Sequence, residues 1–225
     1  MTDTLHDLVA ALQQPALFPH PVTRFAVIET HISIILLTGT FAYKFKKPVD
    51  FGFLDFSTLA KRRHFCAEEL RLNQRLAPEL YLEVVPVSSG PRLGADGEVI
   101  EYAVRMREFE QASQFDRMLD AGGLDPVHID ALALRIAEFH AGVAVAGPES
   151  MHGRPAAVQA PVEENFSHIL DCKHDPRERE LLFPLHDWTR QARQDLQTVL
   201  KARKDGGFIT ECHGDLHLRN VALVD

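Results

Sequence analysis

Short hydrophobic runs separated by polar turn residues dominate the first half of the chain. Three such runs, rich in aromatic and β-branched residues, cover 25–28, 32–37 and 41–45. Two further runs, at 82–87 and 99–109, are joined by the turn-rich segment 88–97. The pattern predicts an antiparallel meander over 25–45, followed by two more strands.

Two segments of this half have helical spacing instead. Residues 3–14 place four aliphatic side chains on one helical face and end before Pro15. Ser57 is a suitable N-cap for a helix that reaches about Ala77, where Pro78 ends it. The core-facing positions predicted for this second helix include one acid, and they are Phe65, Glu69, Leu72 and Leu76.

Beyond Glu110 the spacing of apolar residues becomes mainly helical. The helices expected there cover 113–120, 125 to about 140, 163–172 and 176–203. Residues 147–161 are rich in proline and glycine and are predicted to be a loop, and 208–210 is predicted to be a short strand. The order of elements therefore predicts an α+β fold of two lobes, a sheet lobe at 1–109 and a helical lobe at 110–225.

Composition narrows the function classes. Of the 225 residues, 45% are hydrophobic and 25% charged, which is ordinary for a soluble globular protein. The net charge of −8 argues against general nucleic-acid binding, which needs a basic face. The longest clean apolar run, Ile34–Leu37, is too short for a membrane span. The N-terminus lacks the pattern of a signal peptide and the three cysteines are scattered, so we expect a cytoplasmic protein without membrane partners.

The strongest chemical signal lies in residues 213–220. His213, Asp215 and Asn220 have the spacing His-x-Asp-x-x-x-x-Asn. In phosphotransfer sites of the protein-kinase type, the Asp accepts the proton of the acceptor hydroxyl and the Asn binds a nucleotide-bound Mg²⁺. A surface turn without chemistry is the simpler alternative, but the apolar run 221–224 fits a loop flanked by strands. The motif predicts Asp215 as catalytic base and Asn220 as metal ligand.

The same residues are also suited to bind a catalytic metal ion. His213, Asp215 and His217 form His-x-Asp-x-His, and alternate residues of an extended segment lie on one face. Imidazole and carboxylate groups are ligands that a hydrolytic metal centre uses. A metallohydrolase therefore stays open as an alternative function.

A lysine and a glutamate upstream match a kinase-type site. Lys44 lies in a predicted strand and is suited to hold nucleotide phosphates, although an edge lysine facing solvent is the simpler reading, and Lys46 and Lys47 compete for the role. Glu69 lies on the inward face of a predicted helix, where an acid is unfavourable unless it is paired. An ion pair between Lys44 and Glu69 explains both the lysine in the strand and the acid on the inward helix face. Glu68 is the alternative partner of Lys44.

Nucleotide contacts are predicted from the order of elements alone. Thr30, His31 and Ser33 lie in the first hairpin connection, where a kinase covers the phosphates, but no Gly-x-Gly-x-x-Gly occurs there. The segment from Met106 to Glu110 would be the hinge between the lobes. Its backbone, at Met106 and Glu108, is suited to bond an adenine edge.

These residues together resemble the aminoglycoside phosphotransferase-like branch of the protein-kinase-like fold. The matching segments are 43–44, 68–73, 135–140 and 213–220, and, for a narrower bacterial subfamily, 29–33, 43–48 and 53–56. In that subfamily the kinase-like domain commonly precedes a P-loop ATP-binding domain. The resemblance implies a phosphotransferase that uses ATP and Mg²⁺ to phosphorylate a hydroxyl of a small molecule. Lys44 would hold phosphates, Glu69 would position it, Asp215 would be the base and Asn220 would bind Mg²⁺.

The chain departs from the family pattern at its end. The second metal-binding Asp is expected roughly a dozen residues after the Asn, whereas Asp225 is only five after Asn220. A P-loop motif, Gly-x-x-x-x-Gly-Lys-[Ser/Thr], does not occur. We therefore expect a C-terminally truncated kinase-like chain with impaired catalysis, and a non-catalytic nucleotide-binding module is the alternative.

Overall fold

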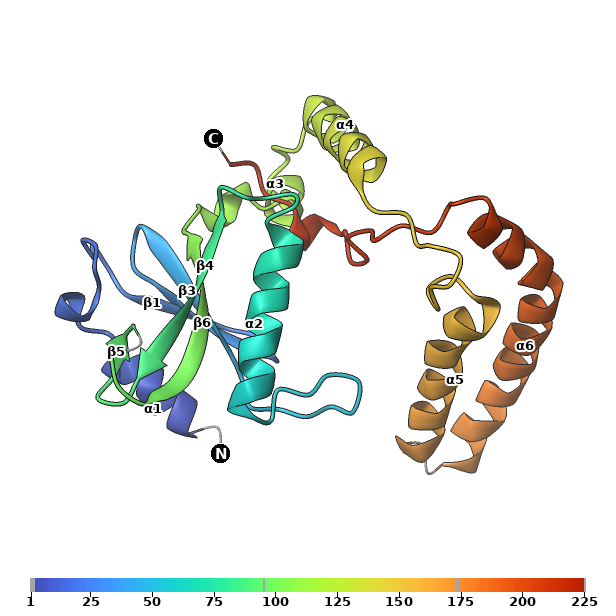
Figure 1. Ribbon diagram of the computed structural model, residues 1–225, viewed down its shortest axis with the longest axis horizontal. Coiled ribbons are helices and arrows are strands. Elements are labelled where there is room, and N and C mark those ends of the chain that lie inside the picture. The colour runs from blue at the N-terminus through green and yellow to red at the C-terminus, as the bar shows by residue number, and fades with distance from the viewer. Residues whose placement is uncertain (1–2, 95, 173–174, 225) are drawn as a thin grey trace. The chain divides into compact units, whose positions relative to one another are not determined.

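The computed structural model describes residues 3–94, 96–172 and 175–224 (Figure 1). The chain forms two compact units. The first comprises the chain up to Asp125 together with the segment from Asp215 onward, and the second comprises Pro126–Gly214. The predicted lobes, 1–109 and 110–225, separate the sheet-rich part of the chain from the helical part. This division stays a prediction.

A six-stranded antiparallel sheet forms the body of the first unit, with the strand order β1-β2-β3-β6-β4-β5. The strands are β1 (Ala26–Glu29), β2 (Ser33–Leu37), β3 (Phe41–Lys46), β4 (Tyr81–Ser88), β5 (Arg92–Leu93) and β6 (Val99–Arg107). The predicted meander is confirmed, because β1, β2 and β3 pair in sequence order. The short strand β5 lies in the segment that was predicted to be only a turn.

The hydrophobic core lies on one face of this sheet. The helix α1 (Asp3–Ala11) and the residue after it supply Leu5, Val9 and Leu12, which are buried. They pack in one cluster with side chains of β2 and β3, among which the fully buried ones are Ile34, Leu36, Tyr43 and Phe45. Because side chains alternate along a strand, the residues between these positions face the other side of the sheet.

The helix α2 (Leu59–Asn73) lies against β6 and β4, and Figure 1 shows it crossing in front of the sheet. Its N-cap is Thr58, whose hydroxyl accepts a hydrogen bond from the Lys61 N–H, so the prediction of Ser57 was wrong by one residue. The buried residues of α2 are Arg62 and Cys66, whereas all four predicted core positions are only half-buried. The face that α2 buries is therefore rotated from the predicted one.

Charge pairing explains this rotation of α2. The Nε atom of Arg62 donates to both carboxylate oxygens of Glu101 on β6, at 2.9 Å each, and both side chains are buried. A buried arginine is tolerated only with such a partner. A search for apolar residues at helical spacing cannot find a face that carries charged groups.

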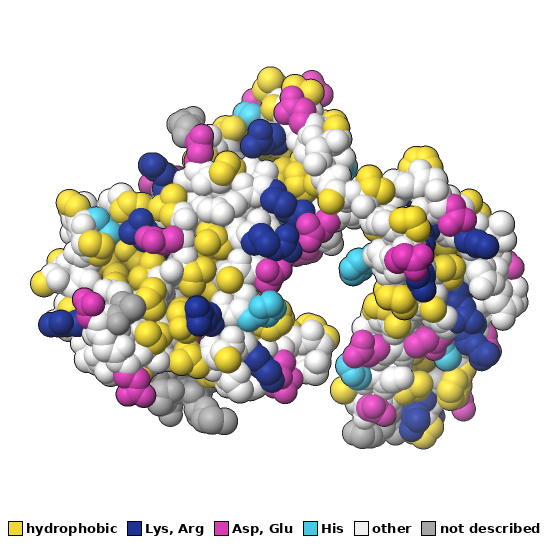
Figure 2. Space-filling view, viewed as in Figure 1, with side chains coloured by type: hydrophobic (Ala, Val, Ile, Leu, Met, Phe, Trp, Pro, Cys, Tyr) yellow, Lys and Arg dark blue, Asp and Glu magenta, His cyan; other side chains and the backbone are white. Residues whose placement is uncertain are grey.

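The remaining helices are α3 (Phe115–Asp120) in the first unit and α4 (Pro126–Gly142), α5 (Pro155–Cys172) and α6 (Pro176–Asp205) in the second. Within the second unit α5 packs against α6. At their contact the ring centroids of His186 and Phe166 are 4.5 Å apart, and the His186 ring forms a hydrogen bond with the Glu163 carboxylate. Hydrophobic side chains remain at the surface of this pair (Figure 2). In the part of the chain that the structure describes, no helix has the length and apolar character needed to cross a membrane.

Two predictions for the second unit were wrong. Residues 147–161 are not all loop, because α5 begins at Pro155 and contains Pro161. Proline at the first helical position is favourable, since its missing N–H would have no partner there, so the composition was misleading. Residues 208–210 form no strand, because Thr210 makes only an isolated bridge with Val145.

We predict that Leu12→Ala lowers the free energy of unfolding by about 2–5 kcal/mol, because Leu12 is fully buried against the sheet and its removal leaves a cavity. Urea unfolding followed by circular dichroism measures the change. Asp7→Ala on the exposed side of α1 is the control and is expected to stay within about 0.5 kcal/mol of the wild type. Equal stability of the two variants would show that α1 is not part of the core.

Candidate functional site

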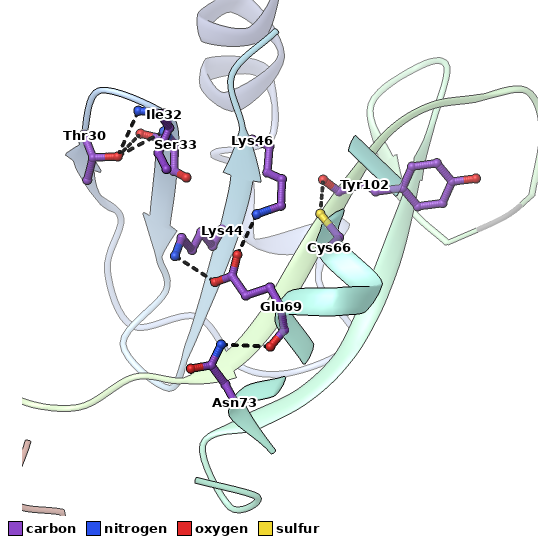
Figure 3. Close-up of polar contacts among 9 residues, drawn as sticks. All are labelled: Thr30, Ile32, Ser33, Lys44, Lys46, Cys66, Glu69, Asn73 and Tyr102. Carbon is purple, nitrogen blue, oxygen red and sulfur yellow. Dashed lines mark hydrogen bonds and ion pairs between the residues drawn. The ribbon is translucent and has the colours of Figure 1, made fainter. Parts of the chain in front are cut away.

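Two lysines of β3 share one glutamate of α2 on the sheet face opposite the core (Figure 3). The Nζ atom of Lys44 lies 2.7 Å from Oε1 of Glu69, and that of Lys46 lies 2.7 Å from Oε2. The two lysines are two residues apart, so alternation along the strand directs both to α2. The predicted ion pair between Lys44 and Glu69 is confirmed. Glu68 instead pairs with Arg71 on the surface of the helix.

The electrostatics of this cluster keep its charged groups ionised. Burial acts to raise the pKa of Glu69, but Lys44 and Lys46 lower it by more, so the pKa lies below its ordinary value of 4.5. Burial acts to lower the pKa of Lys44, but the Glu69 carboxylate beside it raises it by more, above the ordinary 10.5. At neutral pH the cluster therefore contains two positive charges and one negative charge.

Lys46 is the member of this cluster that the sequence analysis did not place. It was taken only as a competitor of Lys44, yet its side chain is only 6% exposed and contacts Glu69 directly. Lys46 lies two residues after Lys44 on the same strand, so both side chains face the same side of the sheet. This spacing was the sequence signal that could have placed Lys46 beside Glu69. Asn73, one turn after Glu69, donates to the Glu69 carbonyl at 2.8 Å and supports this end of α2.

The first hairpin connection is held closed by its own polar groups. The Thr30 hydroxyl accepts from the Ser33 N–H at 3.0 Å, and the Thr30 N–H donates to the Ser33 carbonyl. His31 is exposed at the turn. Ser33 lies opposite Lys46 in the register and is fully buried, and its hydroxyl has no hydrogen-bond partner among the described residues. Nucleotide binding by Thr30, His31 and Ser33 stays a prediction.

The predicted hinge residues lie at the end of β6. Met106 pairs with Ala42 of β3. The Glu108 carboxylate accepts hydrogen bonds from the N–H groups of Thr38 and Gly39 and thereby holds the β2–β3 turn. The Glu108 N–H donates to the Thr40 carbonyl, so that donor is already used. Adenine binding by Met106 and Glu108 stays a prediction.

The motif residues 215–220 form a compact loop in the first unit. The short 3₁₀ helix η3 (Leu218–Asn220) brings the Asn220 side chain back to Asp215. Its Nδ2 donates to the Asp215 carbonyl at 2.8 Å and to Oδ2 at 3.1 Å. The Asp215 side chain is 77% exposed, so its carboxylate is held in place and accessible at the same time.

Backbone pairing with a distant segment anchors this loop. The Phe115 N–H donates to the Val221 carbonyl at 2.9 Å, and the Leu223 N–H donates to the Ser113 carbonyl at 2.9 Å. The Gln114 side chain donates to the Arg219 carbonyl at 3.1 Å. The residues after Asn220 therefore run antiparallel to 113–115. Asp225 lies outside the described residues.

The metallohydrolase alternative finds no support in the geometry. Within residues 3–94, 96–172 and 175–224, no group of three or more His, Cys, Asp or Glu side chains is arranged to hold a metal ion. Gly214 has a φ of 83° and bends the chain between His213 and Asp215, so the segment is not extended as the prediction for His213, Asp215 and His217 required.

Comparison with known protein families shows which family the chain belongs to. A model described as the phosphotransferase enzyme family, APH, matches residues 53–225. The chain belongs to this family. Its α+β architecture, with a small antiparallel sheet and a set of helices, is the kinase-like fold that the resemblance implied.

Similar proteins occur in mycobacteria. Uncharacterized proteins of Mycobacterium tuberculosis and Mycobacterium bovis are 28% identical to this phosphotransferase-family chain over 209 residues. The match covers 92% of the chain and 41% of each relative, so the chain spans less than half the length of these relatives. No solved structure matches it.

The residues of this family member fit the nucleotide and metal that the family usually uses. Mg²⁺ prefers oxygen ligands, and the Asn220 carboxamide, which lies beside the Asp215 carboxylate in one loop, offers one. Phosphates bind to ammonium groups, and the excess positive charge at Lys44 and Lys46 suits a polyanion. Lys44 is the more accessible of the two, at 25% exposed.

We predict that Glu69→Gln destabilises the fold by roughly 3 kcal/mol at pH 7, because it leaves the buried Lys46 and the partly buried Lys44 without their counter-charge. Folding lowers the pKa of Glu69, so its contribution is present above 4.5 and is lost as the pH falls below that value. The difference between wild type and variant should therefore shrink between about pH 5 and pH 3. Urea titrations at several pH values measure it.

Glu68→Gln is the matched control for this experiment. Glu68 precedes Glu69 on α2 and pairs with Arg71 at the surface, where an ion pair contributes at most about 1 kcal/mol. A Glu69→Gln variant as stable as Glu68→Gln at pH 7 would contradict the buried cluster.

Proposed function

We propose that this protein is an ATP-dependent phosphotransferase that phosphorylates a hydroxyl group of a small molecule. The observation that carries the proposal is the partly buried Lys44–Glu69 ion pair, found in a chain of the phosphotransferase family that also carries the Asp215–Asn220 loop. A strand lysine held by a helix glutamate is the arrangement with which kinases bind nucleotide phosphates.

Lys44 and Glu69 bind and orient the nucleotide in this proposal. Glu69 directs the Lys44 ammonium, and the excess positive charge of the cluster attracts the phosphates. The Asn220 carboxamide supplies an oxygen atom suited to Mg²⁺. Bound MgATP supplies the phosphoryl group and the charge neutralisation that its transfer requires.

Asp215 acts as the base. Its carboxylate takes the proton of the acceptor hydroxyl as the hydroxyl oxygen bonds to the γ-phosphorus and the bond to the β,γ-bridging oxygen breaks. The hydrogen bond from Asn220 at 3.1 Å holds the carboxylate in one orientation. Exposure of 77% leaves room for an acceptor of variable shape. The acceptor class proposed here, small hydroxyl compounds, includes aminoglycosides without being limited to them.

We predict that Asp215→Asn lowers kcat by about 10²- to 10⁴-fold, because an amide of the same size cannot accept the proton. ATP consumption and phosphate transfer to a panel of hydroxyl compounds, aminoglycosides included, are measured with the complete product of the gene. Calorimetry with MgATP should show binding within a few-fold of the wild type. Asp187→Asn, at an exposed position of α6, is the control and should leave both quantities unchanged.

Two outcomes of this experiment would count against the proposed function. An unchanged rate in Asp215→Asn would exclude Asp215 as the base. MgATP binding by the wild type without turnover on any acceptor would favour a non-catalytic nucleotide-binding module.

A further inference from the structure

Lys46 has no role in the proposed mechanism, yet it occupies half of the Glu69 carboxylate. Each oxygen of Glu69 contacts one lysine at 2.7 Å, so the two ammonium groups bind the same anion from different sides (Figure 3). The second lysine therefore calls for a separate explanation.

The two lysines differ in their access to solvent. The Lys46 side chain is 6% exposed, whereas that of Lys44 is 25% exposed. The Lys46 ammonium lies 4.8 Å from the centroid of the Phe56 ring, which covers it on another side. Between Glu69 and an aromatic ring, Lys46 has little room for a ligand. Lys44 is the lysine that an anion can reach.

The neighbouring charged groups do not neutralise this cluster. Arg62 and Glu101 bond to each other. Burial raises the pKa of the Cys66 thiol to about 12, so Cys66 is neutral at pH 7. The group of Lys44, Lys46 and Glu69 therefore keeps an excess of one positive charge.

Lys46 changes what happens when Lys44 binds an anion. With Lys44 as its only partner, Glu69 would repel an arriving phosphate and would lose its counter-charge when Lys44 turned toward that phosphate. Glu69 is only 12% exposed, and an unpaired buried carboxylate is strongly unfavourable. The contact with Lys46 removes both penalties because it stays in place.

We propose that Lys46 is a positioning residue, which holds and neutralises Glu69 so that the Lys44 ammonium can bind nucleotide phosphates. The proposal rests on the proposed function, since it takes ATP as the ligand of Lys44. It assigns different roles to two lysines that are two residues apart on one strand.

The test measures MgATP affinity by calorimetry in the complete protein. Lys46→Met should weaken binding about tenfold or more, because the net charge of the cluster falls from +1 to zero. Adding Glu69→Gln to Lys46→Met should recover only part of the lost affinity, because it removes the carboxylate that Lys46 neutralised and, with it, the group that orients Lys44. A merely structural role of Lys46 predicts the opposite, since a second change in a packed cluster would weaken binding further.

Lys61→Met is the matched control. It removes the same charge from the first turn of α2, where Lys61 pairs with Asp55 at the surface, and should leave MgATP affinity within twofold of the wild type. Wild-type affinity in Lys46→Met, or a double variant weaker than Lys46→Met, would overturn the proposal. Absence of MgATP binding by the wild type would overturn the proposed function and this inference together.

A measurement on the wild type covers the case in which Lys46→Met does not fold. Trace acetylation of lysines, read by tandem mass spectrometry, reports the accessibility of each amine with and without MgATP. MgATP should protect Lys44 several-fold and leave the low labelling of Lys46 unchanged. Protection of Lys46 without protection of Lys44 would reverse the two roles and overturn the proposal.

Discussion

The alternation of side chains along β3 is the constraint on which the first unit depends. Tyr43 and Phe45 point into the core that α1 covers, while Lys44 and Lys46 point to Glu69 on α2. A shift of one residue would bury the lysines in the apolar core and expose the aromatic rings. Because β3 lies between β2 and β6, hydrogen bonds on both edges hold it in this register.

The position of α2 follows from the same constraint. The face of α2 turned to the sheet carries charges, and it pairs them with charges on the strands: Glu69 with Lys44 and Lys46, and Arg62 with Glu101. Ion pairs depend on direction and distance more sharply than hydrophobic contacts do. The charged groups therefore set the rotation of the helix about its axis, and they bring the proposed phosphate-binding lysine to a defined place.

The motif loop depends on a different kind of contact. Asp215 and Asn220 are close because a 3₁₀ turn folds the intervening residues, and this loop is anchored by backbone hydrogen bonds to residues 113–115. More than a hundred residues separate the two paired segments in the chain. Backbone groups that pair over such a separation leave no pattern of side chains by which the pairing could be found.

The sequence by itself determined five of the six strands, most of the helices, the α+β class and the Lys44–Glu69 pair, because periodicity and the need to pair a buried charge act locally or between neighbouring elements. Tertiary structure alone decided that Arg62 and Cys66 face the sheet. It also decided that residues 155–161 are helical despite two prolines. The face of α2 depends on partners that lie on another element, and the helix at 155–161 depends on where its prolines fall in the backbone. Composition and spacing carry no information about either.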